Sequence, residues 1–137
     1  MMRRLAVVLL AGLLGACAES PRPLLRAPDP PPQVSTAECG GLRVQFTLQR
    51  KLRNAPVYEV YVTDLSGQPL AEGARVVLAF TSTGNNVSTT TVVAQSTGAG
   101  HYGSAGGFTL TSGPWKVEAI VRRATEAEAV CVFDVNV

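Results

Sequence analysis

The chain has very few of the side chains that bind metal ions or act as catalytic bases. Its 137 residues include two methionines, at positions 1 and 2, a single histidine, His101, and three cysteines. One imidazole needs Asp, Glu or Cys partners to hold zinc, and a copper(I) site made from thioether sulfur needs methionines. A hydrolytic triad would have only His101 as its base. We therefore expect no metal or other cofactor and no enzymatic activity.

The chain also lacks an excess of either charge. It has 12 Lys and Arg against 10 Asp and Glu, and removal of a segment that contains Arg3 and Arg4 leaves ten of each. Proteins that bind phosphate backbones present a basic surface, so we expect no nucleic-acid partner. Residues 98–103 match the pattern G-x-G-x-x-G, but no helix is predicted to follow and receive a pyrophosphate, so we expect no nucleotide. The match indicates a glycine-rich hairpin, with His101 in a turn or at the surface.

No hydrophobic run is long enough to remain as a transmembrane helix. Arg3 and Arg4 precede the apolar segment Leu5–Leu14, whereas about 20 apolar residues are needed to cross a bilayer. The run Leu14-Gly15-Ala16-Cys17 ends this segment. The arrangement resembles the signal of bacterial lipoproteins, whose mature chain begins at a lipid-modified cysteine.

This resemblance implies a signal peptide at residues 1–16 and a lipid such as palmitate on Cys17. Ala18, rather than Asp, implies sorting to the outer membrane of a bacterium that has two membranes. We expect a protein of the cell envelope, anchored by lipid in the outer membrane and facing the periplasm or the cell surface. An ordinary signal peptidase could instead cut after Ala18 and release a soluble protein.

Residues 17–37 are predicted to be a disordered, proline-rich linker behind the lipidated cysteine. Six of the nine prolines lie in residues 18–37, including Pro30-Pro31-Pro32, and the segment has no apolar periodicity. Such composition favours an extended polyproline-like chain. Twenty residues would reach roughly 60 Å at about 3.1 Å per residue. We expect the linker to hold the following domain clear of the membrane.

Residues 38–137 are predicted to form one β domain. Alternating apolar positions or β-branched runs indicate strands near residues 42–48, 58–62, 76–80, 87–95, 108–110, 115–121 and 131–137. Turn signals, among them Gly113-Pro114, separate these strands. The pattern predicts a seven-stranded antiparallel immunoglobulin-like β-sandwich. Because aromatic residues are few, we expect a core made mainly of Val, Leu and Ala.

Assigning Cys17 to lipid leaves Cys39 and Cys131 as an even pair in an oxidising compartment. One cysteine opens the first predicted strand and the other lies in the last, and these strands often lie side by side in sandwiches. We expect a disulfide between them. Two buried free thiols or a redox-active pair are the alternatives, although no Cys-x-x-Cys motif is present to lower a thiol pKa.

Two further stretches resemble small bacterial sandwich domains of the YtkA-like family, which is related to FixH-type accessory proteins. The first runs from Asp64 through Gly67, Pro69 and Leu70 to Gly73-Ala74-Arg75-Val76, and the second contains Gly100-His101-Tyr102 and Gly113-Pro114-Trp115-Lys116-Val117. The resemblance covers about residues 57–122. It implies a sandwich outside the cytoplasmic membrane, often in copper handling or oxidase assembly. Metal-binding members carry Met and His where this chain has the Ser- and Thr-rich residues 81–91.

The sequence thus predicts a membrane-anchored, non-enzymatic envelope lipoprotein that presents a small β domain as a binding, adaptor or structural module. Its expected partners are the membrane, through the N-terminal lipid, and another envelope protein, approached through a sheet edge or the glycine-rich loops. The alternative is an accessory protein in copper handling or oxidase assembly.

Overall fold

The computed structural model describes residues 26–52, 55–84, 87–104 and 109–137. Within these ranges the chain forms eight strands. They are β1 (Gln33–Cys39), β2 (Leu42–Gln49), β3 (Val57–Asp64), β4 (Arg75–Ser82), β5 (Thr89–Gly98), β6 (His101–Ser104), β7 (Pro114–Arg122) and β8 (Ala129–Asn136). Among the described residues there is no helix of the length and hydropathy that a membrane span requires.

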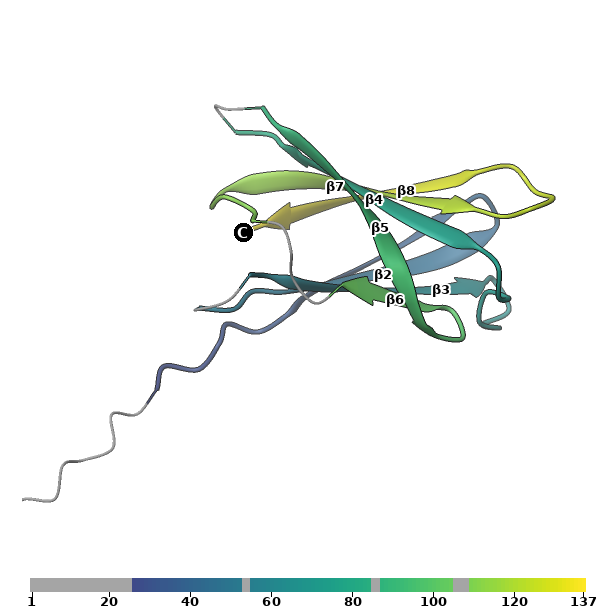
Figure 1. The fold of residues 1–137 in the computed structure, drawn as a ribbon, viewed down its shortest axis with the longest axis horizontal. Coiled ribbons are helices and arrows are strands. Elements are labelled where there is room, and N and C mark those ends of the chain that lie inside the picture. Colours follow the sequence, from purple (N-terminus) through teal and green to yellow (C-terminus); the bar gives the residue numbers. More distant parts are fainter. Residues whose placement is uncertain (1–25, 53–54, 85–86, 105–108) are drawn as a thin grey trace, which may run out of the picture.

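All strand pairs are antiparallel and belong to one sheet with the order β1-β2-β3-β6-β5-β4-β7-β8. The sheet curls over, so that β2, β3 and β6 form one layer and β4, β7 and β8 the other (Figure 1). The prediction of an all-β antiparallel domain is therefore confirmed. The result is a nearly closed, barrel-like sheet of eight strands, and the predicted number of seven is wrong.

The predicted and observed strands differ at three places. Strand β1 begins at Gln33, inside the predicted linker of residues 17–37, and pairs with β2 along its whole length. Strand β6 begins at His101, because the tight turn at Gly98–Gly100 sends the chain straight back beside β3. In contrast, Thr109 and Leu110 of the strand predicted near 108–110 have no regular structure, and Phe108 lies outside the described residues.

The turn between β1 and β2 explains why β1 joins the sheet. Gly40 and Gly41 both have positive φ, 54° and 74°, which a two-residue hairpin turn of the right twist requires. A Cβ on Gly40 would lie 2.7 Å from Ala129 Cβ. The β1–β2 hairpin therefore packs directly against Ala129, the first residue of β8.

The predicted alternation in β2, β3, β4, β7 and β8 is confirmed, since the apolar residue at every second position points inward and is buried. The expected aliphatic core is only half right, because six of the eight aromatic residues are also buried. Phe46 lies at the centre, with ring centroids 5.6 Å from Phe133 and 6.2 Å from Phe80. Few large rings suffice to fill a space that two layers about 10 Å apart enclose.

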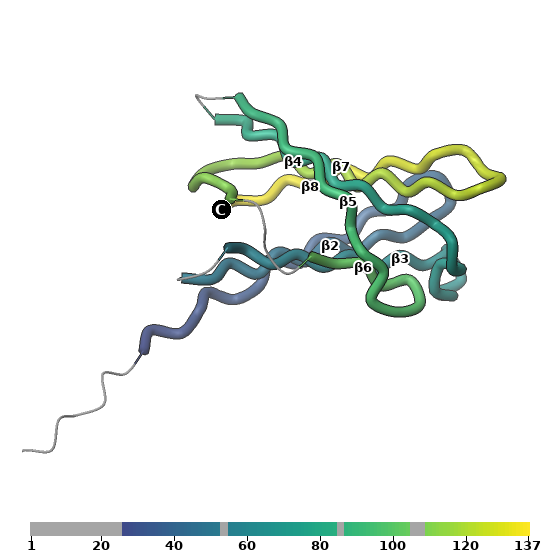
Figure 2. The backbone as a smooth tube through the Cα atoms, viewed as in Figure 1, coloured from purple at the N-terminus to yellow at the C-terminus, as the bar shows by residue number. Residues whose placement is uncertain are grey.

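Strand β5 carries the sheet from one layer to the other. It pairs with β4 through residues up to Ala94 and with β6 from Gln95 onward, and its register shifts between Ser96 and Gly98. Such a bulge bends and twists a strand locally. In Figure 2 this segment crosses steeply between the two layers.

Candidate functional site

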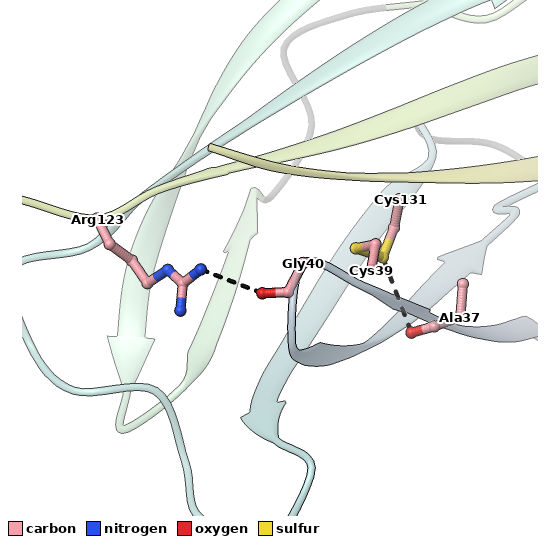
Figure 3. The surroundings of a disulfide bond; sticks show 5 residues. All are labelled: Ala37, Cys39, Gly40, Arg123 and Cys131. Carbon is pink, nitrogen blue, oxygen red and sulfur yellow. Dashed lines mark hydrogen bonds between the residues drawn. A yellow bond between two sulfur atoms is a disulfide. The ribbon is translucent and has the colours of Figure 1, made fainter. Parts of the chain in front are cut away.

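The predicted lipid site, Cys17, lies outside the described residues. Cys39 and Cys131 form a disulfide with a Cα–Cα distance of 5.5 Å across a sequence separation of 92 residues. The bond joins β1 to β8, the two ends of the sheet, as Figure 3 shows. Beside it, the Arg123 guanidinium donates to the Gly40 carbonyl oxygen at 3.2 Å. The cysteine pair therefore links the two ends of the sheet.

A side-chain amide fastens the other end of the same seam. Asn136 N–H donates to Gln33 Oε1 at 3.1 Å, and Gln33 Nε2 donates to the Asn136 carbonyl oxygen. Gln33 thus satisfies one backbone donor and one backbone acceptor, as a paired strand residue would. The seam between β1 and β8 is held by a disulfide at one end and by this amide at the other.

His101 lies on strand β6, rather than in a turn, and points outward from the layer of β1, β2, β3 and β6. Its Nδ1 lies 3.1 Å from Glu59 Oε1, and its ring stacks on that of Tyr61 with centroids 4.2 Å apart. The described residues contain no group of three or more His, Cys, Asp or Glu side chains that could hold a metal ion. This cluster is an exposed cross-strand contact, and copper handling remains a prediction that no described geometry favours.

The outward side of this layer is polar, and we call it the polar face. Its central row is Thr36 on β1, Gln45 on β2, Tyr61 on β3 and His101 on β6. A shallow hollow of about 210 Å³ lies beside Tyr61. Among the outward residues of β1, β2 and β3, Val34 and Val57 are the large aliphatic side chains, and they lie in different rows. Hydroxyl, amide and charged groups of this kind are the usual solvated side of a sheet.

The motif that resembles the YtkA-like family builds a turn. Asp64 Oδ1 accepts hydrogen bonds from the Ser66 hydroxyl at 2.7 Å and from the N–H groups of Ser66 and Gln68, each at 2.9 Å. The Ser66 hydroxyl and then the Gln68 N–H lower the pKa of the Asp64 carboxyl. A Cβ on Gly100 would lie 2.6 Å from the Val62 carbonyl oxygen. The motif residues therefore pack the 65–74 loop against the β5–β6 turn.

The outward side of the other layer is apolar, and we call it the apolar face. The pairing places Val93, Val77, Ile120 and Val130 in one row across β5, β4, β7 and β8. The next row is mixed, with Ala79 on β4 and Val132 on β8 on either side of Glu118 on β7, and Thr91 on β5. Val93, Val130 and Val132 are 47%, 41% and 49% exposed. Four aliphatic side chains in register on an outer face are uncommon for a solvated sheet.

Charged residues flank the apolar row on both sides. Arg122 donates to Glu128 at 2.7 Å at the end of β7, and Lys116 lies 3.7 Å from Glu118 nearer its start. Arg75, at the start of β4, has no ion pair among the described residues. An apolar centre with a charged rim is the anatomy of protein–protein interfaces.

A hollow lies where the linker meets the barrel. It has a volume of about 750 Å³ and is lined mainly by Pro28, Pro30, Arg50, Leu52, Leu110 and Val137. We call this end of the barrel, with residues 26–32 and 50–52, the linker end. The opposite end, with the 65–74 and 123–128 loops, is the far end.

Comparison with protein-family models, with curated proteins and with solved structures finds no match to this chain.

Proposed function

We propose that this protein is a non-enzymatic envelope lipoprotein, anchored through Cys17, whose β domain binds another envelope protein through the apolar face. The anchor is supported by the Leu14-Gly15-Ala16-Cys17 signal behind two arginines and a short apolar run. A disulfide-closed domain suits an oxidising compartment outside the cytoplasm. The row of Val93, Val77, Ile120 and Val130 is the observation that carries the binding role.

The size of this row favours a transient partner over a permanent one. One row across four strands about 4.8 Å apart, with Ala79 and Val132 of the next row, gives an apolar patch of no more than about 200 Å². A stable interface buries about 800 Å² on each side, so the patch alone does not hold two copies of the chain together. Confinement of both partners to one membrane raises their effective concentration and makes a small interface sufficient. Because Arg75 at the rim has no ion pair among the described residues, we expect the partner to present a carboxylate next to the aliphatic side chains that contact the apolar face.

The immunoglobulin-like character of the domain is part of the same proposal. It is supported by two facing layers around a common core and by a disulfide that joins strands of opposite layers. The domain would be a variant of that fold in which β5 pairs with both layers and closes the sheet.

Photo-crosslinking in the native envelope tests the binding role. A photoreactive residue replaces Thr91 on the apolar face or, as a matched control, Thr36 on the polar face; both threonines are exposed. We expect an adduct from position 91 alone, of a mass that is not a multiple of the chain's own, which Val93→Asp abolishes and Val34→Asp leaves unchanged. Equal adducts from both positions, adducts only with a second copy, or no effect of Val93→Asp would overturn the proposal.

A further inference from the structure

The end of the chain that leads to Cys17 is fastened to the barrel. Gln49 Nε2 donates to the Pro30 carbonyl oxygen at 2.8 Å, and the Leu52 N–H donates to Asp29 Oδ1 at 3.0 Å. Lys51 Nζ lies 3.4 Å from the second carboxylate oxygen of Asp29. The Leu52 N–H holds the pKa of Asp29 below its usual value, so this fastening is charged at neutral pH.

This fastening shortens the free part of the linker. Twelve residue steps separate Cys17 from Asp29 (29 − 17), which corresponds to about 37 Å at the polyproline rise of 3.1 Å per residue. The predicted linker of residues 17–37 would reach roughly 60 Å at the same rise per residue. Since the chain leaves the barrel at the linker end, a lipid on Cys17 keeps that end close to the membrane and the far end away from it.

The linker end has the chemistry of a surface that faces lipid headgroups. Residues 26–32 and 50–52 carry three cationic side chains, Arg26, Arg50 and Lys51, and one carboxylate, that of Asp29. Arg26 is exposed, and Arg50 and Lys51 are half-buried. Leu52 is 59% exposed beside these cations. Juxtamembrane basic groups are attracted by anionic lipids, and exposed aliphatic side chains insert at the interface.

We propose that the linker end docks on the anionic phospholipid headgroups of the membrane that holds the lipid anchor. Arg26 and Arg50 meet headgroup phosphates and Leu52 lies among the headgroups, which leaves the apolar face upright and accessible. The inference rests on the proposed anchor at Cys17 for its geometry. The far end provides the contrast, because Leu65 is 53% exposed there near Asp64 and Glu72.

Fluorescence quenching on vesicles tests the docking. The mature chain is coupled through the Cys17 thiol to a maleimide lipid, with the other two cysteines kept as the disulfide. Leu52→Trp is compared with Leu65→Trp in vesicles of phosphatidylcholine with brominated acyl chains, with or without 30% phosphatidylglycerol. Buried Trp115 is a constant background in both variants. We expect at least twofold stronger quenching for Leu52→Trp, only with phosphatidylglycerol, and its loss in 0.5 M salt.

Charge variants locate the contact. Arg50→Gln, and separately the exposed Arg26→Gln in case the first variant disturbs folding, should each reduce the Leu52→Trp quenching at least twofold. Arg75→Gln, outside the linker end, should not change it. Equal quenching of the two tryptophans, quenching without anionic lipid, or indifference to both arginine variants would show that the docking proposal is wrong.

The chemical coupling makes this test independent of natural lipidation. Palmitate labelling of the full chain in a bacterial envelope tests the anchor itself, and labelling should be lost with Cys17→Ser and kept with Cys39→Ser. Labelling without docking would retain the proposed function and reject this inference. Docking without labelling would reject the anchor and retain a membrane-facing linker end.

Discussion

On the polar face the strand register aligns Thr36, Gln45 and Tyr61, whereas on the apolar face it aligns Val93, Val77 and Ile120. Both faces cover the same core through the same alternation of inward and outward side chains. A sheet with one solvated side needs polar groups only on that side. This difference between the two faces is the observation on which the proposed binding role of the apolar face rests.

The largest effect comes from opening the seam that joins the two layers. Replacing Cys39 and Cys131 with alanine should lower the free energy of unfolding by about 4–5 kcal/mol, because the bond closes a 92-residue separation in the unfolded chain. Urea unfolding followed by the fluorescence of Trp115 measures the loss, with Cys17→Ser as the control that leaves stability unchanged. A loss below about 1 kcal/mol would mean that the rest of the barrel holds β1 and β8 together.

An exchange of isosteric residues sharpens the comparison of the faces. Val77 on the apolar face and Thr63 on the polar face are both 6% exposed and both point outward. Val77→Thr buries a hydroxyl among aliphatic neighbours and should cost about 1–2 kcal/mol. Thr63→Val should change stability by less than about 0.5 kcal/mol. Chemical denaturation of the two variants measures both losses of unfolding free energy. Equal losses would contradict the assignment of distinct faces.

The smallest effect concerns pH and the turn that ends β3. Because hydrogen bonds from Ser66 and Gln68 lower the pKa of Asp64, its carboxylate stabilises the fold above the unfolded value of 3.8, and that contribution is lost as the pH falls through the folded pKa. Asp64→Asn should therefore lower the urea midpoint at pH 7 and leave it nearly unchanged near pH 2. A midpoint difference that persists at pH 2 would assign the effect to the amide's geometry instead.

Much of the barrel could be predicted because its inward residues follow a strict period of two. Leu42, Val44, Phe46 and Leu48 alternate with polar residues, so β2 is visible in the sequence. Strand β1 was missed because it follows three prolines and contains few large apolar residues; it is held by backbone pairing to β2 and by its two ends. The disulfide was predictable from the cysteine count, whereas no sequence pattern predicts the hydrogen bonds between the Gln33 amide and Asn136.

The apolar face could not be read from single strands. Val76-Val77-Leu78 and Val130-Cys131-Val132-Phe133 are continuous apolar runs, which is the available signal that both sides of these strands are apolar. That Val77 and Ile120 are neighbours depends on the register between β4 and β7, which the hairpins and the core determine together. The linker end could not be predicted for the same reason, because its contacts join residues that are far apart in the sequence, such as Asp29 and Leu52, 23 residues apart.

The seam between β1 and β8 also bears on how such a domain behaves when many copies lie close together. A free strand edge is a template on which another chain can add a strand, and rows of such edges lead to aggregation. Here the two edges lie against each other, clasped by Gln33 at one end and by the disulfide at the other. A neighbouring chain would therefore have to separate β1 from β8 before it could add a strand to either edge.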